Sequence, residues 1–276
     1  MKKIFYTLIF LIQMFPLLSL GQTSMISFNI RYDNQNDNQN WWKFRKSEVS
    51  QMINYYSPEI IGIQEGLNNQ IKYLDSTLSD YKYIGVGRDD GELKGEYAAI
   101  FYKTERIKLL STKTYWLSET PDTVSVGWDA SMKRIVTFGE FLDKKTNDTY
   151  YVFNCHFDHK GKISQLKSVE LILNIIEDKG ITNDKIILMG DLNCEQDEEP
   201  IELLKTEMVD NYNKKGVKTY GPLGTFNQFN PNIEINKRID YIFTKNIKVR
   251  AYVHIDDRRK NNLLLSDHLP VLIKIE

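Results

Sequence analysis

The sequence is poor in cysteine, and this scarcity excludes a fold that depends on disulfides. Only Cys155 and Cys194 occur among 276 residues, whereas small secreted domains stapled by disulfides carry far more for their length. An exported chain could pair these two thiols, but we expect both to be buried and free. A clustered Cys/His ligand set is also missing, so a tight structural zinc site is not expected.

The chain also lacks internal repeats, low-complexity tracts and a surplus of basic residues. It carries 36 basic and 37 acidic residues, a net charge of −1. Proteins that grip long nucleic acid usually show a basic surplus, because neutralisation of phosphates drives that binding. The charge balance therefore disfavours a duplex-binding protein without excluding one. The length allows one large domain, or two small ones, with a sizeable core.

Long apolar runs are missing except at the N-terminus. Lys2 and Lys3 precede an apolar run over residues 4–20, and Ser19 and Gly21 are small residues at its end. This pattern predicts a signal peptide over residues 1–21 and a mature domain over 22–276 that is exported, either to the periplasm or outside the cell. An uncleaved membrane anchor is the alternative, although the run is short for a span and Pro16 interrupts it.

Removal of this segment would change the charge balance. Residues 1–21 hold two lysines and no acid, so the mature chain keeps 34 basic residues against 37 acidic ones, a net charge of −3. We expect this mature chain to be a monomer without stable membrane insertion.

The most informative stretch is 185–193, in which four apolar residues lead into Gly-Asp-Leu-Asn. It predicts a buried strand that ends at a polar edge. In an extended segment Asp191 and Asn193 would share one face, because side chains alternate along a strand. A carboxylate beside an amide suits a metal-bound phosphate and its attacking water. Because Gly, Asp and Asn are also ordinary turn residues, a capped turn is the alternative.

The remaining elements follow from apolar spacing. Further strands are expected over 25–31, 59–65, 81–86, 96–102, 133–141, 150–156, 238–243, 249–255 and 266–275. Helices are expected over 46–56, 67–78, 163–178 and 199–205. Segment 109–132 holds Trp116 and Trp128 but few regular signals. Strands with helices between them predict an α/β layered sandwich with its catalytic groups on the loops along one rim.

Polar residues gather at these strand ends and include two of the four histidines, His156 and His268. The set consists of Asn29, Glu65, Glu96, His156, Asp191, Asn193, Asp240, Asp267 and His268. Each member alone has an ordinary explanation as a cap, a satisfied core histidine or a solvated charge. Their joint placement instead favours one catalytic site. Arg134 could be either a phosphate clamp or a structural ion pair, His159 a substrate contact, and His254 a structural residue.

The motifs and their order resemble the endonuclease/exonuclease/phosphatase superfamily, which joins pancreatic-type deoxyribonucleases, apurinic endonucleases, neutral sphingomyelinases, inositol polyphosphate 5-phosphatases and deadenylases. The residues that carry the resemblance are Asn29, Gln64-Glu65, Gly95-Glu96-Tyr97, Asn154-Cys155-His156, Gly190-Asp191-Leu192-Asn193, the segment 238–243 and Ser266-Asp267-His268. They cover the chain from about residue 23 to 276. Segment 115–129 resembles an uncharacterised secreted bacterial branch, so the resemblance implies no particular substrate.

The resemblance implies two packed, mostly antiparallel β-sheets sandwiched between helical layers, a four-layer sandwich. It also implies Mg²⁺-dependent hydrolysis of phosphate esters, in which Mn²⁺ could substitute. Asn29 and Glu65 would hold the metal, with Asp267 contributing from the far side. Mg²⁺ prefers hard oxygen ligands and keeps several waters, so a few protein groups suffice.

The resemblance also implies the catalytic roles. Asp191, helped by Asn193, would orient and deprotonate the attacking water. Two histidine–acid pairs would bind phosphate oxygens or aid the leaving group, namely His268 with Asp240 and His156 with Glu96. Each imidazole needs an acid to fix its tautomer and raise its basicity.

The substrate class remains open between related alternatives. A small phosphorylated substrate, as a diester or a monoester, is favoured over long nucleic acid because of the charge balance. A secreted nuclease acting on DNA or RNA is the first alternative, and a non-catalytic binding module on the same fold is the second. The metal-site Glu, the Gly-Asp-x-Asn stretch and the terminal Asp-His are all present, which favours catalysis.

Overall fold

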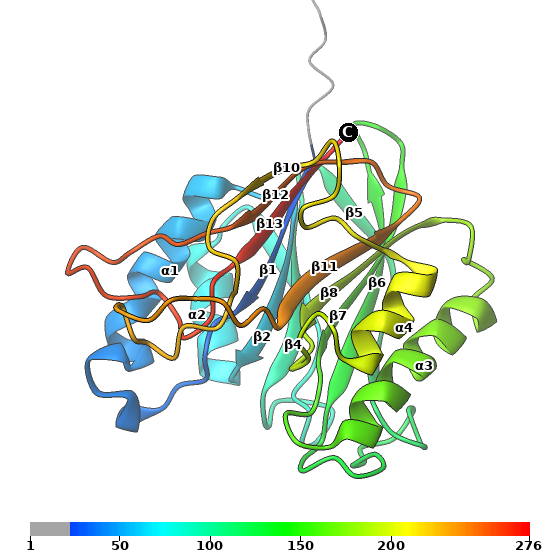
Figure 1. Cartoon of the computed structure of the whole chain (residues 1–276), viewed down its shortest axis with the longest axis horizontal. Coiled ribbons are helices and arrows are strands. Elements are labelled where there is room, and N and C mark those ends of the chain that lie inside the picture. Colours follow the sequence, from blue (N-terminus) through cyan, green and yellow to red (C-terminus); the bar gives the residue numbers. More distant parts are fainter. Residues whose placement is uncertain (1–22) are drawn as a thin grey trace, which may run out of the picture.

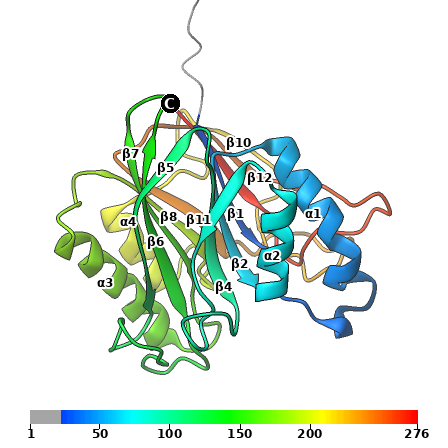
Figure 2. The ribbon, with the colours of Figure 1, turned by 180° about the vertical axis from the view of Figure 1, so that it is seen from behind.

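The structure is a computed structural model and describes residues 23–276. The predicted signal peptide, residues 1–21, lies outside the described residues. In the described part, two β-sheets pack face to face, and two helices cover the outer face of each sheet (Figures 1 and 2). The predicted four-layer α/β sandwich is therefore confirmed.

The first sheet has seven strands in the order β10-β12-β13-β1-β2-β4-β3. They are β1 (Thr23–Asn29), β2 (Ile60–Gly66), β3 (Tyr81–Ile84), β4 (Tyr97–Lys103), β10 (Lys218–Tyr220), β12 (Val249–His254) and β13 (Val271–Ile275). The pairs β1–β2 and β10–β12 are parallel, and the other neighbours are antiparallel. Helices α1 (Trp42–Tyr56) and α2 (Asn68–Thr77) bury their apolar faces against this sheet.

The second sheet has six strands in the order β5-β6-β7-β8-β11-β9. They are β5 (Ile107–Trp116), β6 (Ile135–Asp143), β7 (Thr149–His156), β8 (Lys185–Asp191), β9 (Val209–Asp210) and β11 (Asp240–Lys245). Only β7 and β8 pair in parallel in this sheet. Helices α3 (Lys162–Asp178) and α4 (Glu199–Glu207) cover it. Within residues 23–276, no helix is both long and apolar enough to span a membrane.

The space between the sheets is filled by alternating apolar side chains from both, such as Ile60 of β2 and Met189 of β8. Toward the end of the sandwich where β2 and β7 finish, this core contains a buried amide pair. Gln64 Nε2 donates to Asn154 Oδ1 over 2.6 Å, and Asn154 Nδ2 donates to the carbonyl oxygens of Ile63 and Ala99. Because buried amides are costly unless they are hydrogen-bonded, this pair fixes how the two sheets meet.

Several predicted boundaries are corrected. The strand expected over 266–275 begins only at Val271, after Pro270, which has no N–H to donate to a ladder. The irregular segment expected over 109–132 starts with β5, whose exposed middle residues hide the usual alternation. The helix expected from residue 46 begins at Trp42, and the polar loop before it contains a short 3-10 helix, η1 (Gln35–Asn40).

Candidate active site

The predicted site residues converge on one cavity of about 370 Å³ at the end of the sandwich where β2, β7 and β8 finish. Nine of the eleven line it directly: Glu65, Glu96, Arg134, His156, His159, Asp191, Asn193, Asp267 and His268. The other two, Asn29 and Asp240, lie behind this wall and hydrogen-bond to residues in it. Residues from both sheets therefore form a single site.

Strand register brings three of these residues together. His156 pairs with Asp191 across the β7–β8 ladder, and Asp191 pairs with Asp240 across the β8–β11 ladder. Residues opposite one another in a sheet point to the same face. Gly190 permits this approach: its φ is +148°, and a Cβ there would lie 2.0 Å from the Cys155 carbonyl oxygen. The Gly-Asp-x-Asn stretch therefore needs glycine at position 190, because a larger residue would clash with the backbone of the neighbouring strand.

Asp191 is the centre of the site. It accepts a hydrogen bond from Asn29 Nδ2 over 2.9 Å, and its Oδ2 lies 3.4 Å from His156 Nε2 and 3.8 Å from His268 Nε2. Burial, reinforced by the Asp240 carboxylate, raises the pKa of Asp191 to about 7. A carboxylate with such a pKa is suited to accept a proton near neutral pH.

Glu65 reaches the site through an irregularity in β2. The β2–β4 register shifts between Ile63 and Gly66, and Glu65 has a φ of +62°. Such a bulge redirects a side chain that would otherwise point to the helix side of the sheet. Glu65 Oε1 consequently accepts from Asn29 Nδ2 over 3.0 Å, and its Oε2 accepts from the Tyr32 N–H over 3.1 Å.

Asn193 lies in the site for a different reason than predicted. Strand β8 ends at Asp191, and Asn193 has a φ of +49°, so the two residues do not alternate along an extended strand. The Asn193 N–H donates to Asp191 Oδ1 over 3.0 Å, and its Nδ2 donates to the Phe157 carbonyl over 3.1 Å. The capped turn that was the alternative prediction is therefore present, and it is part of the site because it holds the Asp191 carboxylate in place.

The predicted pairing of His268 with Asp240 is present. His268 Nδ1 lies 2.8 Å from Asp240 Oδ2, which also accepts from Thr225 Oγ1 over 2.6 Å. Burial opposes a charged ring, but the Asp240 and Asp191 carboxylates outweigh it and raise the pKa of His268 well above its usual range. His268 is therefore cationic at neutral pH.

The pairing of His156 with Glu96 differs from the expectation. His156 Nδ1 lies 3.7 Å from Glu96 Oε2 and has no hydrogen-bond partner in the described part of the chain. Glu96 is held instead by both terminal nitrogens of Arg88, at 2.7 and 2.9 Å. Burial, Arg134 and Arg88 hold the pKa of His156 well below its usual range. The two imidazoles are therefore in opposite charge states.

Arg134 makes structural contacts with its neighbours, one of the two alternatives that the sequence left open. Its Nε lies 3.4 Å from Asp158 Oδ2, and its Nη2 lies 3.1 Å from His159 Nδ1, so the side chain is anchored on one side. Its Nη1 is buried without a hydrogen-bond partner among residues 23–276. Burial and the Arg134 charge lower the pKa of His159, which leaves its Nδ1 free to accept from the guanidinium.

Six cavity residues were not identified from the sequence: Arg31, Tyr32, Met132, Phe226, Lys237 and Ile239. Most of them belong to connections between strands, where neither periodicity nor a motif marks a residue. Arg31 had one usable signal, because it follows the predicted ligand Asn29 by two positions. Arg88 was missed because it opens a segment that looks like an ordinary charged loop.

Both cysteines are free and buried, as predicted. Cys155 Sγ lies 3.6 Å from the Met189 carbonyl oxygen. Burial raises the pKa of the Cys194 thiol to about 12. Neither thiol is therefore a reactive nucleophile in the folded chain.

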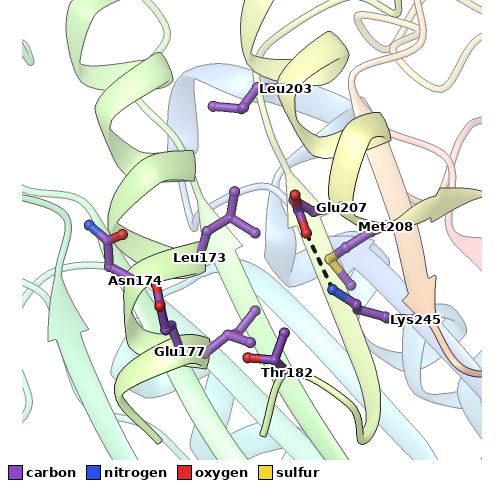
Figure 3. Close-up of a pocket in the computed structure, with 9 residues that line it drawn as sticks. Leu173, Asn174, Glu177, Thr182, Leu203, Glu207, Met208 and Lys245 are labelled. Carbon is purple, nitrogen blue, oxygen red and sulfur yellow. Dashed lines mark hydrogen bonds and ion pairs between the residues drawn. The ribbon is translucent and has the colours of Figure 1, made fainter. Parts of the chain in front are cut away.

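A second cavity, of about 360 Å³, lies between α3 and α4 (Figure 3). Leu173 and Leu203 border it, and Glu207 pairs with Lys245 at 3.3 Å on one side. None of the predicted catalytic residues lines it. Of these two cavities, the one at the strand ends contains the clustered carboxylates and histidines.

Potential metal ligands are clustered in that cavity. One ligand atom from each of Glu65, His156 and Asp191 lies within 4.8 Å of the others, and the same holds for Asp191, Asp240 and His268. The second group is already internally paired through His268 and Asp240. The first group, with Asp267 in the same cavity wall, is the candidate cation site.

Comparisons with known proteins agree with this geometry. The model of the Endonuclease/Exonuclease/phosphatase family matches residues 26–268. An endonuclease/exonuclease/phosphatase from Bacteroides vulgatus superposes with a TM-score of 0.86 at 35% identity, covering 93% of this chain and 99% of that one. A mannosyl-6-phosphatase from Bacteroides thetaiotaomicron VPI-5482 gives 0.86 and 35%, with 92% and 99% covered.

More distant proteins share the fold or part of the sequence. D. rerio TDP2 complexed with single strand DNA product has a TM-score of 0.71 at 16% identity, covering 92% of this chain and 99% of that one. An uncharacterized protein of Acanthamoeba polyphaga mimivirus is 27% identical over 254 residues, 85% of this chain and 92% of that protein. The chain described here therefore belongs to the endonuclease/exonuclease/phosphatase family of phosphoester hydrolases.

Proposed function

We propose that this chain is a Mg²⁺-dependent phosphatase or phosphodiesterase that acts on a small phosphorylated substrate, with phosphorylated sugars as the favoured class. The observation that supports this best is the cavity itself. Its volume of about 370 Å³ is that of a small-molecule site, and cationic groups and a carboxylate base converge in it. The 35% identity with a protein named mannosyl-6-phosphatase supports the sugar class.

The donor set fits Mg²⁺. The carboxylates of Glu65 and Asp267 border the cavity and offer hard oxygen ligands. Burial raises the pKa of Asp267, as it does that of Asp191. The positive charges around these two carboxylates therefore do not fully compensate for the loss of water. A divalent cation would restore their ionised forms. Glu65 and Asp267 would hold it, with Mn²⁺ as a substitute.

Asn29 has a narrower role in this proposal than the sequence predicted. Its Nδ2 donates to both Glu65 and Asp191, while its Oδ1 accepts from the Arg31 N–H over 3.0 Å. In this orientation the amide fixes the distance between the two carboxylates. Asn29 therefore contributes to the metal site indirectly. Its hydrogen bonds position the Glu65 carboxylate and the carboxylate of the proposed base, Asp191.

The chain's own residues supply the remaining chemistry. Asp191 would orient a water and take its proton, because its carboxylate lines the cavity beside His156 and His268. The cationic His268 would donate to a phosphate oxygen, where negative charge grows in the transition state. The neutral His156 can donate from Nε2 toward the same region. Bound Mg²⁺ would add a further positive charge at the phosphoryl oxygens.

Arg134 and His159 would complete the phosphate side of the cavity. The Arg134 guanidinium is held by Asp158 and His159, so its geometry is fixed before substrate arrives. A preorganised guanidinium costs little entropy to use and suits the geometry of a phosphate. We assign both residues to substrate binding rather than to proton transfer.

We also propose that the chain is exported. The proposal is supported by the two N-terminal lysines, the apolar run and the small residues at its end. N-terminal sequencing of the protein recovered from its own host's envelope and medium would test it. A mature N-terminus near Gln22 is the expected result, and an intact Met1 in the cytoplasm would overturn the proposal.

A substrate panel tests the function. Release of inorganic phosphate or alcohol would be followed with Mg²⁺ present for hexose 6-phosphates, nucleoside monophosphates, a simple aryl phosphodiester, and single- and double-stranded DNA. The control is Asp191→Asn, which keeps the shape of the side chain but removes the base. Turnover of a small ester that this variant abolishes supports the proposal. Efficient cleavage of DNA alone would replace it with the nuclease alternative.

A further inference from the structure

Two segments of the cavity wall leave the first sheet beside each other. The first segment, residues 29–32, continues from β1, and the second segment, residues 265–268, precedes β13. Both contribute side chains to the cavity at the strand ends. The last pair of the β1–β13 ladder is Ser27 with Val271. Beyond that pair the ladder no longer sets the distance between the two segments, so other contacts must set it.

Arg45 of α1 bridges the two segments. Its Nη1 donates both to the Ile30 carbonyl oxygen over 2.9 Å and to the Leu265 carbonyl oxygen over 2.7 Å. Its Nη2 donates to the Arg31 carbonyl oxygen over 3.2 Å, and its Nε donates to that of Asn40 over 2.5 Å. Because the donors of a guanidinium form a rigid planar fork, one side chain holds four carbonyl oxygens in fixed directions.

The guanidinium of Arg45 is a buried charge. The residue is 0% exposed, and its Cζ lies 5.3 Å from the ring centres of Trp42 and of Phe229. Burial lowers the pKa of Arg45 to about 10, although the Asp267 carboxylate opposes this effect, so the group is charged at neutral pH. A buried charge is costly unless it is hydrogen-bonded. Displacement of either segment from the guanidinium therefore carries a free-energy cost.

The bridge takes its position from helix α1. Arg45 lies on the buried side of this helix together with Val49 and Ile53, which pack on the first sheet. Ser266 Oγ donates to the Asn29 carbonyl oxygen over 2.7 Å and so joins the two segments directly. Arg45 adds what this bond lacks, because it ties both segments to a helix that is itself packed on the sheet.

Each segment holds groups of the candidate cation site. In the first segment, Asn29 Nδ2 and the Tyr32 N–H donate to the two oxygens of the Glu65 carboxylate. In the second segment, Asp267 and His268 line the cavity. A shift of one segment relative to the other would therefore change the distance between the Glu65 and Asp267 carboxylates.

We propose that Arg45 is a positioning residue that sets the distance between these two segments, and thereby between the carboxylates of Glu65 and Asp267. This inference rests on the proposed metal-dependent function. Arg45 acts through backbone carbonyl oxygens and does not itself line the cavity.

The test measures the affinity of the purified chain for Mn²⁺ from the electron paramagnetic resonance signal of free Mn²⁺. Arg45→Lys keeps the charge, but its single nitrogen cannot span the four carbonyl oxygens. We expect the affinity for Mn²⁺ to fall by about 10- to 100-fold, the usual range when a residue behind a metal ligand is replaced. Unchanged affinity in a variant that near-ultraviolet circular dichroism shows to be folded would overturn the inference.

Arg259 provides a matched control. It is also buried, and its guanidinium donates to the carbonyl oxygens of Gln39 and Phe44 and to Asn40 Oδ1, but to neither segment. Arg259→Lys should lower the free energy of unfolding and leave the affinity for Mn²⁺ unchanged. A loss of Mn²⁺ affinity equal to that of Arg45→Lys would show that a buried arginine acts here only through general stability, and it would overturn the inference.

Chemical rescue provides a second readout. Arg45→Ala leaves space for a guanidinium ion from solution, which should restore part of the Mn²⁺ affinity at concentrations far below those that unfold the chain. Potassium at the same ionic strength should not restore it, and equal effects of the two cations would contradict the inference. In case neither Arg45 variant folds, Phe229→Leu removes a ring that lies over the guanidinium. We expect weaker Mn²⁺ affinity there, and unchanged affinity would count against the inference.

The same measurements separate this inference from the proposed function. Mn²⁺ binding by the unaltered chain, and its loss in Glu65→Gln, would support the metal site whatever the Arg45 variants show. Absence of any Mn²⁺ binding by the unaltered chain would overturn the proposed metal-dependent function, and the inference with it.

Discussion

His268 and Asp240 form a buried ion pair in which Nδ1 donates to Oδ2 over 2.8 Å. The other ring nitrogen of His268 faces the cavity and lies 3.8 Å from Asp191 Oδ2. Asp240 therefore sets both the orientation of the ring and its charge, and it does so from outside the cavity. Asp240 does not line the cavity, yet it thereby controls a residue that does.

Replacing Asp240 with Asn should lower kcat/KM by roughly 100- to 10,000-fold, the usual range for loss of acid–base assistance. The carboxylate is the leading opposing influence to burial on the pKa of His268. Without it the ring loses its proton at lower pH, so the alkaline limb of the pH–rate profile should move to lower pH. The profile of initial rates from pH 5 to 10 measures this. An alkaline limb that stays in place would contradict the assignment.

Stability gives the same variant a second readout. The folded-state pKa of His268 is raised, so its contribution to the free energy of unfolding is complete below the unfolded value of roughly 6.5 and fades as pH rises through the folded one. In Asp240→Asn, the free energy of unfolding should no longer fall as pH rises through the folded-state pKa of His268. Denaturant unfolding at several pH values, compared with Thr225→Val, separates the charge effect from the lost hydrogen bond of Thr225 to Asp240.

Glu65→Gln should abolish turnover at limiting Mg²⁺ while leaving the fold intact. The amide still can accept from the Tyr32 N–H, but it is a much poorer ligand for a hard cation than a carboxylate. Activity titrated with Mg²⁺, alongside far-ultraviolet circular dichroism, measures both properties. Full activity of the variant at the Mg²⁺ concentration that half-activates the unaltered chain would exclude Glu65 as the principal ligand.

Binding to duplex DNA should be weak and lost at physiological salt. Without residues 1–21 the chain carries a net charge of −3, and phosphate neutralisation by basic residues drives non-specific binding. Fluorescence anisotropy with a labelled duplex at 50 and 150 mM salt measures this. Tight binding that persists at the higher salt would reverse our preference for small substrates.

His254 should make the chain less stable in acid. Burial lowers the pKa of His254 to about 4, and its Nε2 has no hydrogen-bond partner in the part of the chain that the structure describes. Because the folded pKa lies below the unfolded one, stability is complete above roughly pH 6.5 and falls by about 3 kcal/mol as pH drops to 4.

The test for His254 compares how steeply the free energy of unfolding changes with pH, because the substitution itself also changes the free energy at any one pH. His254→Asn can keep the hydrogen bond that Nδ1 makes with the Pro222 carbonyl at 2.7 Å, although it loses the stacking on Tyr212. Its stability between pH 6.5 and 4 should fall less steeply than that of the unaltered chain. Equal slopes would show that other groups dominate the acid response.

The sequence predicted the fold well because most strands alternate regularly and the helices have clear apolar stripes. It could not predict β5, because an edge strand with exposed residues on both faces shows no alternation. It also placed Asn193 on an extended strand, whereas a hydrogen bond to Asp191 turns the chain there. Local periodicity carries no information on such side chain to backbone bonds.

The sequence predicted those residues of the candidate site that lie in motifs at strand ends. Arg31, Arg88 and Lys237 were missed because their relation to the site depends on how connections fold back over it. The interaction of Arg88 with Glu96 also changes the expected partner of His156. Competition between two basic groups for one carboxylate is a three-dimensional property that no spacing in the sequence records.

The alignment of His156, Asp191 and Asp240 across three adjacent strands ties chemistry to folding. A slip of one residue in either ladder would put Asp191 and its partner on that strand on opposite faces of the sheet, because successive side chains point to opposite faces. A misaligned sheet could still bury apolar residues and look folded by circular dichroism, yet it would have no reaction centre. Recovered activity after refolding therefore reports correct strand alignment, and it should lag behind the recovery of secondary structure whenever realignment is slow.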